Sequence, residues 1–281
     1  MGRLTRRHPV IRLAPDEERR RIEVLAVEEP LEIRLNGDPY LVTMRTPGDD
    51  LDLVHGLLNA EGLITAAADI STARYCGGVG EAGENPYNQL DLTLAPGVNP
   101  PPPEERRQVL TSSACGLCGA TSIDQVLRTG RYQLTDELRI AQEVIATAPD
   151  RLREHQRMFE KTGGLHAAGL MDATGALHCV REDVGRHNAV DKVVGWALRQ
   201  GRLPARELAL VVSGRASFEL TQKAVQAGIA MLVAVSAPSS LAVELADRAG
   251  LTLAGFVRGG SMNVYTHPDR VLTARSSVAR G

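Results

Sequence analysis

The stretch ELALVVSGRASFELTQKAVQAGIAMLVAVS, residues 207–236, decides the fold. It begins with a continuous apolar run at 207–213, which is typical of a strand buried on both faces of its sheet. Residues 218–227 carry apolar side chains at helical spacing and end before Gly228, a common helix stop. A second apolar run follows at 230–236. A strand, a helix and a strand in this order predict a layered α/β sheet.

The same alternation continues on both sides of this stretch. The further elements that we expect are strands over 167–171, 176–181 and 251–257 and helices over 187–200 and 239–249. The first two of these strands form a hairpin around the turn at 172–175. Because strands and short helices alternate from Gly164 onward, we expect an α/β layered domain over 149–281, with helices on both faces of its sheet.

Residues 1–148 show a mixed pattern and predict a smaller α+β domain. Strands over 22–35 and 40–46 flank Asn36-Gly37, a strong hairpin signal because both residues tolerate positive φ. Asp49-Asp50 can cap a helix. Two helical stretches, 136–148 and 151–161, are separated by Pro149, and we place the domain boundary at this interruption.

Composition excludes some classes of function. The 281 residues hold 32 Lys and Arg against 34 Asp and Glu, so the net charge of -2 disfavours a general nucleic-acid binder. No apolar run approaches the ~20 residues of a membrane span, and residues 1–22 lack the apolar core of a secretory signal. We therefore expect a cytoplasmic protein. The arginine-rich first 21 residues are expected to be a disordered terminus without a function.

The segment SSACGLCG, residues 112–119, holds two of the four cysteines. Thr121 to Asp124 matches a capping box, so Cys115 and Cys118 are expected on a glycine-containing loop just before a helix. Backbone N–H groups near a helix start favour the thiolate form of a cysteine. In the cytoplasm such a pair is kept reduced and is therefore reactive or metal-binding.

Several uses of this thiol pair remain open. A thioredoxin-like role is disfavoured because the only tryptophan, Trp196, is far along the chain. Structural zinc would need four ligands, which Cys76, Cys179 or histidines could complete only in space, and we expect no metal. The interpretation we prefer is a mobile pair that carries sulfur as a persulfide, with Cys115 as carrier and Cys118 as helper.

Five segments in order carry a family resemblance: SSACGLCGATSID (112–124), GGLHAAGL (163–170), REDVGRHNAVDKV (181–193), SGRASFELTQKA (213–224) and FVRGGSMNVYTHPDR (256–270). With these motifs the chain resembles the FdhD family, the sulfurtransferases that serve formate dehydrogenase. The likeness runs from about Val24 to Arg270.

The resemblance implies a cytoplasmic homodimer that takes persulfide sulfur from a cysteine desulfurase. It implies delivery to the molybdenum cofactor, in its bis-molybdopterin guanine dinucleotide form, for the client formate dehydrogenase. Cys115 matches the persulfide-carrying cysteine. The residues that match the cofactor-binding stretch are Phe256, Val257, Arg258, Gly259, Gly260 and Ser261.

The resemblance also implies a cytidine deaminase-like fold for residues 149–281. Deaminase chemistry needs a His-x-Glu and a Pro-Cys-x-x-Cys. Here His166 is followed by two alanines, and no proline precedes Cys115. We therefore expect a shared fold without the deaminase reaction.

A guanine dinucleotide carries a pyrophosphate, whose site requires glycines and a cation or a helix N-terminus. Two stretches, 213–217 and 258–261, follow strands and have this composition, although each alone is also an ordinary turn. We expect them at the same edge of one sheet, where ligands of α/β proteins collect.

Other polar residues are less decisive. Arg186, His187 and Asn188 either cap a helix or touch the cofactor, His166 is interpreted as a turn residue rather than part of a sulfur path, and Cys179 is expected in the core. Nothing in the sequence assigns a role to Cys76. The alternative function is a non-catalytic cofactor chaperone whose thiols form a zinc or redox latch.

Overall fold

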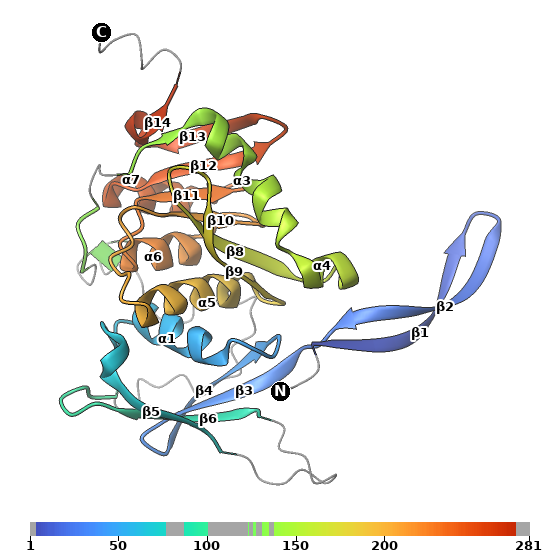
Figure 1. The fold of residues 1–281 in the computed structure, drawn as a ribbon, viewed down its shortest axis with the longest axis horizontal. Coiled ribbons are helices and arrows are strands. Elements are labelled where there is room, and N and C mark those ends of the chain that lie inside the picture. The colour runs from blue at the N-terminus through green and yellow to red at the C-terminus, as the bar shows by residue number, and fades with distance from the viewer. Residues whose placement is uncertain are drawn as a thin grey trace.

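The computed structural model describes residues 4–76, 87–100, 123, 126–127, 131–134 and 138–273. Two sheets with their helices are stacked along one direction, and a long hairpin projects from the side (Figure 1). The structure is a mixed α/β protein, as predicted.

A six-stranded sheet forms the C-terminal part, in the order β13-β12-β11-β10-β8-β9. Its strands are β8 (His166–Met171), β9 (Leu177–Asp183), β10 (Ala209–Val212), β11 (Met231–Ala234), β12 (Thr252–Arg258) and β13 (Ser261–Thr266). The three central strands β10, β11 and β12 run parallel, while β8, β9 and β13 add antiparallel edges. The apolar runs of the sequence therefore form the middle of the sheet, as expected for strands covered on both faces.

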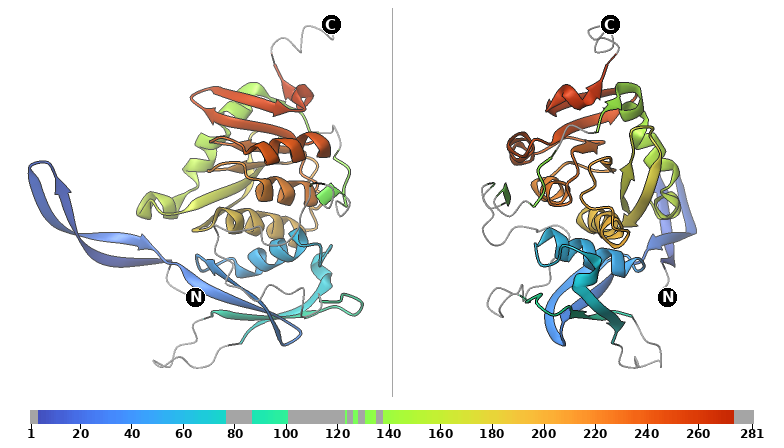
Figure 2. Two further views of the ribbon diagram at one scale, coloured as in Figure 1. Left: turned by 180° about the vertical axis from the view of Figure 1, so that it is seen from behind. Right: turned by 60° about the vertical axis from the view of Figure 1, so that its left-hand side comes forward.

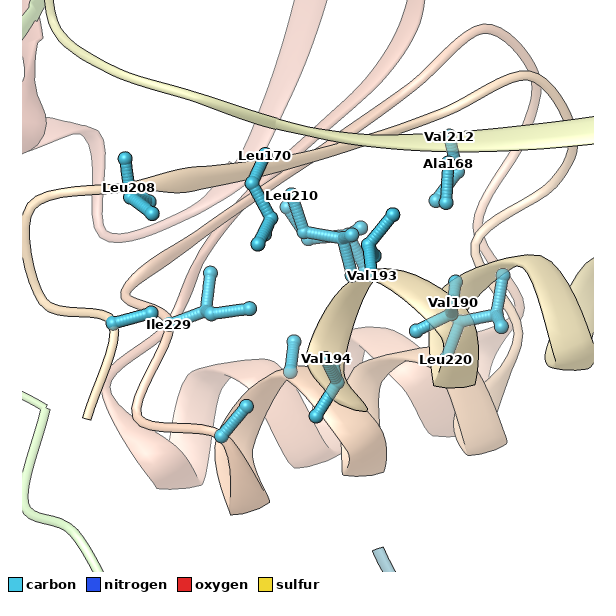
Figure 3. Packing of buried hydrophobic residues seen from close by; sticks show 14 of the residues in the cluster. Ala168, Leu170, Val190, Val193, Val194, Leu208, Leu210, Val212, Leu220 and Ile229 are labelled. Carbon is cyan, nitrogen blue, oxygen red and sulfur yellow. The ribbon is translucent and has the colours of Figure 1, made fainter. Parts of the chain in front are cut away.

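Helices cover both faces of this sheet, which confirms the predicted layers. On one face lie α5 (Arg186–Arg199), α6 (Phe218–Gln226) and α7 (Ser240–Ala249). Figure 3 shows their contact with the sheet: Val190 and Leu220 lie next to each other, facing Ala168 and Val212. On the other face lies α3 (Gln142–Glu154), followed by the short α4 (Arg157–Thr162).

The predicted helix break at Pro149 is wrong, because α3 continues through this proline. A proline inside a helix costs about 3 kcal/mol, since it removes a hydrogen bond and crowds the preceding turn. Ile145, Ala148 and Leu152 are each fully buried against the sheet, and one such Ile or Leu gains about 1.5–3 kcal/mol. The burial of these three side chains thus offsets the cost of Pro149 within the helix. The division of the chain at 148/149 stays a prediction, but the helix that crosses it packs on the C-terminal sheet.

The N-terminal part contains a four-stranded sheet of order β4-β3-β6-β5 and one long helix. Its elements are β3 (Glu29–Leu35), β4 (Asp38–Arg45), α1 (Asp50–Ala60), β5 (Ile70–Tyr75) and β6 (Gln89–Leu94). Asn36 and Gly37 have φ of 54° and 88°, so the predicted hairpin turn is confirmed. The apolar face of this sheet packs on α1.

Helices α1 and α5 join the two parts (Figure 1). Gly56 of α1 and Gly195 of α5 lie at the crossing. A Cβ at Gly56 would overlap the carbonyl oxygen of Asp191, and one at Gly195 would overlap that of Asp52. The two backbones approach so closely that only glycine fits at both positions.

The first residues do not form the disordered terminus that their charge predicts. β1 (Thr5–Ala14) and β2 (Glu17–Ala26) pair antiparallel as a hairpin that extends away from both sheets (Figures 1 and 2). The register places one set of alternate side chains on the same face, and this face is mostly apolar: Pro9, Ile11, Leu13, Ile22 and Val24. Ile11, Leu13 and Ile22 are 54%, 73% and 59% exposed, so the described residues leave this apolar face uncovered.

No helix in the described ranges is both long and apolar enough to cross a membrane.

Candidate functional site

A cavity of about 680 Å³ lies at the carboxyl edge of the parallel strands. Ser213, Val235, Val257 and Arg258 line it from the ends of β10, β11 and β12. Residues of α3 and α4 and the turn that follows them form the opposite wall: Pro149, Asp150, Leu152, Arg153, Gln156, Phe159, Gly163, Gly164, Leu165 and His166. The two stretches that were expected at one sheet edge thus both reach this cavity.

The loop after β10 is tied to the start of β8. Ser213 accepts a hydrogen bond at its Oγ from the backbone N–H of Ala167 over 2.9 Å, and its own N–H donates to the carbonyl of Ala167 over 3.0 Å. Gly214 follows, and a Cβ there would lie 3.6 Å from the Nδ1 of His166. This loop therefore fixes His166 at the cavity wall.

His166 is more than the turn residue that its sequence context predicts. It is the first residue of β8, and it lines the cavity. Burial lowers the pKa of His166 below its usual 6.5, and the positive charges of Arg186 and His187 act in the same direction. A neutral imidazole at the cavity wall offers one hydrogen-bond donor and one acceptor.

The turn between β12 and β13 presents Arg258. Gly259 and Gly260 have φ of 56° and 78°, and Ser261 donates from its Oγ to the carbonyl of Arg258 over 3.1 Å. The pairing of β12 with β13 shifts register between Gly255 and Arg258. Such a bulge redirects the side chains of a strand and is common next to functional sites.

Phe256 supports Arg258 from within this bulge. It adopts a positive φ of 52°, which costs a residue with a Cβ of the order of 1–3 kcal/mol. Its backbone N–H donates to the carbonyl of Ser236 over 3.2 Å, and the Arg258 guanidinium lies 5.9 Å from its ring centroid. A strained residue that positions a cation at a cavity wall is typical of a binding site.

A second cation comes from α3, where sequence reasoning missed it. The guanidinium of Arg153 lies over the ring of Phe159 at 4.1 Å from its centroid, and both residues line the cavity. No local signal in the sequence marks Arg153, because the packing of α3 on the sheet is what brings it to the cavity. Two arginines, a neutral histidine and a serine make the cavity suitable for an anionic ligand with hydrogen-bonding edges.

Some polar residues of the segment 181–193 are buried and bind the protein, while others lie closer to the surface. Lys192 is 1% exposed, and its Nζ lies 2.8 Å from Asp183 Oδ2 and 3.0 Å from the carbonyl oxygen of Thr46. Asn188 donates to Asp183 and to the carbonyl of Met44, so it binds the protein. Arg186 and His187 instead lie at the N-terminal end of α5, near enough to His166 to affect its pKa.

The four cysteines fall into two groups. Cys115 and Cys118 lie outside the described residues. Cys179 is 5% exposed, as expected for a core residue, and burial raises the pKa of its thiol to about 12. Cys76 is exposed. Within the described part of the chain, no group of three or more His, Cys, Asp or Glu side chains could hold a metal ion.

Comparison with known proteins places this geometry in a family. Sulfur carrier protein FdhD of Nocardia farcinica is 58% identical over 96% of both chains. The protein of the same name from Streptomyces coelicolor is 54% identical over the whole of both chains. The one from Mycobacterium tuberculosis is 53% identical over 96% of this chain and all of its own.

A solved structure extends the likeness to the fold. The crystal structure of a candidate formate dehydrogenase accessory protein from Desulfotalea psychrophila aligns with a TM-score of 0.75 at 25% identity, over 96% of this chain and 100% of that one. The model of the FdhD/NarQ family matches residues 26–272, which include both sheets and the cavity. The chain therefore belongs to the FdhD/NarQ family.

Proposed function

We propose that the protein is a sulfur carrier that acts in the maturation of formate dehydrogenase. The names of its relatives support the sulfur-carrying role, and the description of the solved structure supports formate dehydrogenase as the client. The observation that carries the proposal is the cavity at the sheet edge, since a sulfur carrier for a bound acceptor needs a site for that acceptor as well as a thiol.

Sulfur enters on Cys115. The thiolate of Cys115 attacks the outer sulfur of a persulfide on a cysteine desulfurase; the S–S bond of the donor breaks, and the donor cysteine leaves as a thiolate. The product is a persulfide on Cys115. The protein is thus a sulfurtransferase with a covalent intermediate, and it acts in the cytoplasm, where its thiols stay reduced.

The acceptor is the molybdenum cofactor in its bis-molybdopterin guanine dinucleotide form, which is the substrate of this reaction and not a resident group of the protein. The cavity volume of about 680 Å³ lies within the 300–1,000 Å³ that is common for small-molecule sites, which suits one guanine nucleotide arm. Arg258 and Arg153 would bind its phosphates, and Gly259 and Gly260 allow close backbone approach. Phe256, Val257 and Ser261 position this turn.

Sulfur leaves by a second exchange. The thiolate of Cys118 attacks the inner sulfur of the Cys115 persulfide and forms a Cys115–Cys118 disulfide, while the outer sulfur departs as hydrosulfide to the molybdenum centre. A cellular dithiol then reduces the disulfide. The rival function, a chaperone with a zinc or redox latch, would instead leave bound zinc in metal analysis of the purified protein.

Intact mass measurement tests the sulfur step. After incubation with a cysteine desulfurase and cysteine, the protein should gain one sulfur, about 32 daltons. We expect the gain to survive Cys118→Ala and to disappear in Cys115→Ala. A gain that persists when both thiols are removed would refute the proposal.

Calorimetry with guanosine diphosphate tests the acceptor site. Arg258→Ala should weaken binding by about 1–3 kcal/mol, the range of a charge-assisted hydrogen bond. Arg74→Ala is the matched control, because Arg74 is an arginine on β5, away from the cavity. Equal affinity of Arg258→Ala and wild type would place the nucleotide site elsewhere.

We further propose a homodimer in which the apolar face of the β1–β2 hairpin contacts a second copy. An isolated two-stranded hairpin is marginally stable in water, and its exposed Ile11, Leu13 and Ile22 lie on one face. Ile11→Asp with Leu13→Asp should convert the dimer to a monomer in light scattering. Val10→Asp, on the opposite face, should not, and a double variant that remains dimeric would exclude this contact.

The likeness of the C-terminal part to the cytidine deaminase fold also stays a proposal. The stack of α5 and α6 on one face of a sheet with parallel central strands supports it.

A further inference from the structure

The cavity at the sheet edge has a charged rim and an uncharged, buried end. Three lining side chains at the rim are exposed and charged: Asp150, Arg153 and Arg258. Three apolar side chains that line the cavity are buried: Leu152, Leu165 and Val257. A negatively charged part of a ligand is stabilised at the rim, where water and two guanidinium groups surround it, while the buried end accepts an uncharged part.

Gln156 lies at the buried end and has no partner there within the described chain. It is 6% exposed and lines the cavity, and its side-chain amide makes no hydrogen bond with any residue that the structure describes. An amide carries two donor hydrogens and an acceptor oxygen, and burying these groups without partners costs free energy. A buried amide of this kind beside a cavity is typical of a ligand-binding residue.

The start of α4 does not need this amide. Gln156 occupies the position before the helix, but its side chain does not cap it. The carboxylate of Glu182 instead accepts hydrogen bonds from the backbone N–H groups of Met158 and Phe159, over 2.9 and 2.7 Å. These are the two N–H groups that a capping side chain usually binds. Because Glu182 satisfies them from β9, the amide of Gln156 is available to a ligand.

The pairing of β8 with β9 brings two further polar side chains to the same part of the cavity. Glu182, which binds the start of α4, pairs with Ala167 in the register of the two strands. His166 directly precedes Ala167, and Ser213 accepts a hydrogen bond from the N–H of Ala167. The side chains of Gln156, His166 and Ser213 therefore border the cavity around one point of the sheet.

Together these three side chains offer hydrogen bonds without a net charge. Burial favours the neutral imidazole of His166, which has one donor and one acceptor nitrogen. The Oγ of Ser213 accepts from the backbone, and its hydroxyl hydrogen has no acceptor in the described part of the chain. With apolar side chains beside them, these groups suit a flat heterocyclic ring whose edge carries both donors and acceptors.

We infer that Gln156 selects the base of the bound ligand, an assignment that rests on the proposed function. Its Nε2 donates to a ring carbonyl, and its Oε1 accepts from the neighbouring ring N–H. This pair of groups belongs to the 2-amino-4-oxopyrimidine edge that guanine and pterin share. The amine of that edge donates to the acceptor nitrogen of His166. The base thus occupies the buried end, and the phosphates stay at the rim with Arg153 and Arg258.

The 2-amino group is what separates guanine from other purines at this site. The amide of Gln156 can also pair with adenine, whose edge carries an amine and a bare ring nitrogen. Adenine and hypoxanthine both lack the 2-amino group, so they leave the acceptor nitrogen of His166 unpaired. A buried polar group that loses its partner weakens binding. The site therefore prefers guanine over both.

Calorimetry on the wild-type full chain tests this preference without any substitution. Guanosine diphosphate should bind about 5- to 10-fold more tightly than inosine diphosphate, since one hydrogen bond to a buried group is lost. Adenosine diphosphate should also bind more weakly than guanosine diphosphate. Equal affinity for the three nucleotides, or tighter binding of adenosine diphosphate, would overturn the inference.

Gln156→Met tests the residue, because it removes the amide and keeps a side chain of similar size. The affinities for guanosine diphosphate and for guanosine should both fall at least about 10-fold, since both ligands carry the base. Arg258→Ala should weaken only guanosine diphosphate, whose phosphates lie at the rim. Gln142→Met is the matched control, at the exposed first position of α3. Wild-type affinity for guanosine in Gln156→Met contradicts the assignment.

The thermal midpoint separates a binding residue from a structural one. Because the amide has no partner among the described residues, its replacement by an apolar side chain should leave the midpoint unchanged or raise it. A clearly lower midpoint in Gln156→Met than in Gln142→Met would assign the amide to the fold and overturn the inference.

Competition distinguishes the two sources of the recognised edge. Displacement of guanosine diphosphate by guanosine alone identifies the guanine arm of the ligand, and displacement by 6-hydroxymethylpterin alone identifies its pterin. Either result supports recognition of the shared edge, and displacement by neither overturns it. Absence of guanosine diphosphate binding to the wild type would instead overturn the acceptor site of the proposed function. Normal binding that Gln156→Met does not change would overturn only the role of Gln156.

Discussion

Residues 181–193 contribute to two regions of the molecule. One is the joint, where α1 packs on α5, and the other is the carboxyl edge of the six-stranded sheet. The segment has opposite roles in these two regions. At the joint, Asp183, Asn188 and Lys192 are buried, and each binds protein atoms. At the edge, Arg186 and His187 lie near His166, which lines the cavity. Polar residues that are neighbours in sequence therefore have different roles, and the burial of each side chain determines which role it has. Substitutions at the joint should change stability, and those at the edge should change binding or reactivity.

The largest expected effect is the loss of the buried ammonium at the joint. Lys192→Ala leaves the Asp183 carboxylate buried without its counter-ion and should lower the free energy of unfolding by about 3–5 kcal/mol. Urea denaturation measures it. Glu160→Ala, at an exposed position of α4, should change stability by less than about 0.5 kcal/mol. A loss below about 1 kcal/mol in Lys192→Ala would show that the two parts do not depend on this pair.

A substitution at the crossing of α1 and α5 should lower the free energy of unfolding almost as much. In Gly195→Ala the new methyl group overlaps the carbonyl oxygen of Asp52, which the backbone can relieve only if α1 and α5 move apart. We expect a destabilisation of about 3 kcal/mol, the upper part of the range for overpacked sites. Gly164→Ala, where the nearest atom is 3.8 Å away, is the control. Equal thermal midpoints for the two variants would contradict the close crossing.

A substitution of Phe256 tests the same comparison at the carboxyl edge of the sheet. Phe256→Gly relieves a positive φ but removes the ring beneath Arg258. The free energy of unfolding should change by no more than about 1 kcal/mol. Affinity for guanosine diphosphate should fall by about 0.5–1 kcal/mol, the worth of an exposed cation–π contact. A variant that loses stability but keeps its affinity would assign Phe256 to the fold instead.

The smallest effect is a pH dependence at the start of α6. The pKa of Glu219 is lowered from its usual 4.5 to about 2, first by a hydrogen bond from His187, so this carboxylate stabilises the fold fully above pH 4.5, and the stabilisation is lost as the pH falls toward 2. Glu219→Gln should remove this contribution, less than about 1 kcal/mol for a partly exposed pair, so that variant and wild type converge in acid. Urea midpoints of Glu219→Gln and wild type at pH 6 and pH 3 test this prediction. A difference between the two proteins that is larger at pH 3 than at pH 6 would contradict it.

The sequence predicts the six-stranded sheet well, because its signals are local. Apolar runs such as 230–236 and glycines such as Gly228 and Gly250 mark strands and helix ends without reference to distant residues. The turn at 258–261 was found for the same reason, and its place at the cavity followed from the parallel strands. The cofactor role of this turn and the roles of Cys115 and Cys118 stay predictions.

The failures have non-local causes. Pro149 stays helical because three side chains of α3 are buried against a sheet formed later in the chain. Besides its ion pair with Asp183, Lys192 donates a hydrogen bond to the carbonyl of Thr46, which is 146 residues away, so no spacing rule reveals this second contact. The β1–β2 hairpin did leave a local signal, since Ile11 and Leu13 alternate with other residues along β1, but the density of arginines obscured it.

The path of α3 has a practical consequence for anyone who separates the two halves of this molecule. Because Ile145 and Ala148 seal one sheet face, and Ile140 pairs with Val271, a fragment that starts at Pro149 would expose bare apolar strands and aggregate. A fragment that starts before Leu138 would retain this cover. The proper place to cut the gene therefore lies upstream of where composition alone suggests.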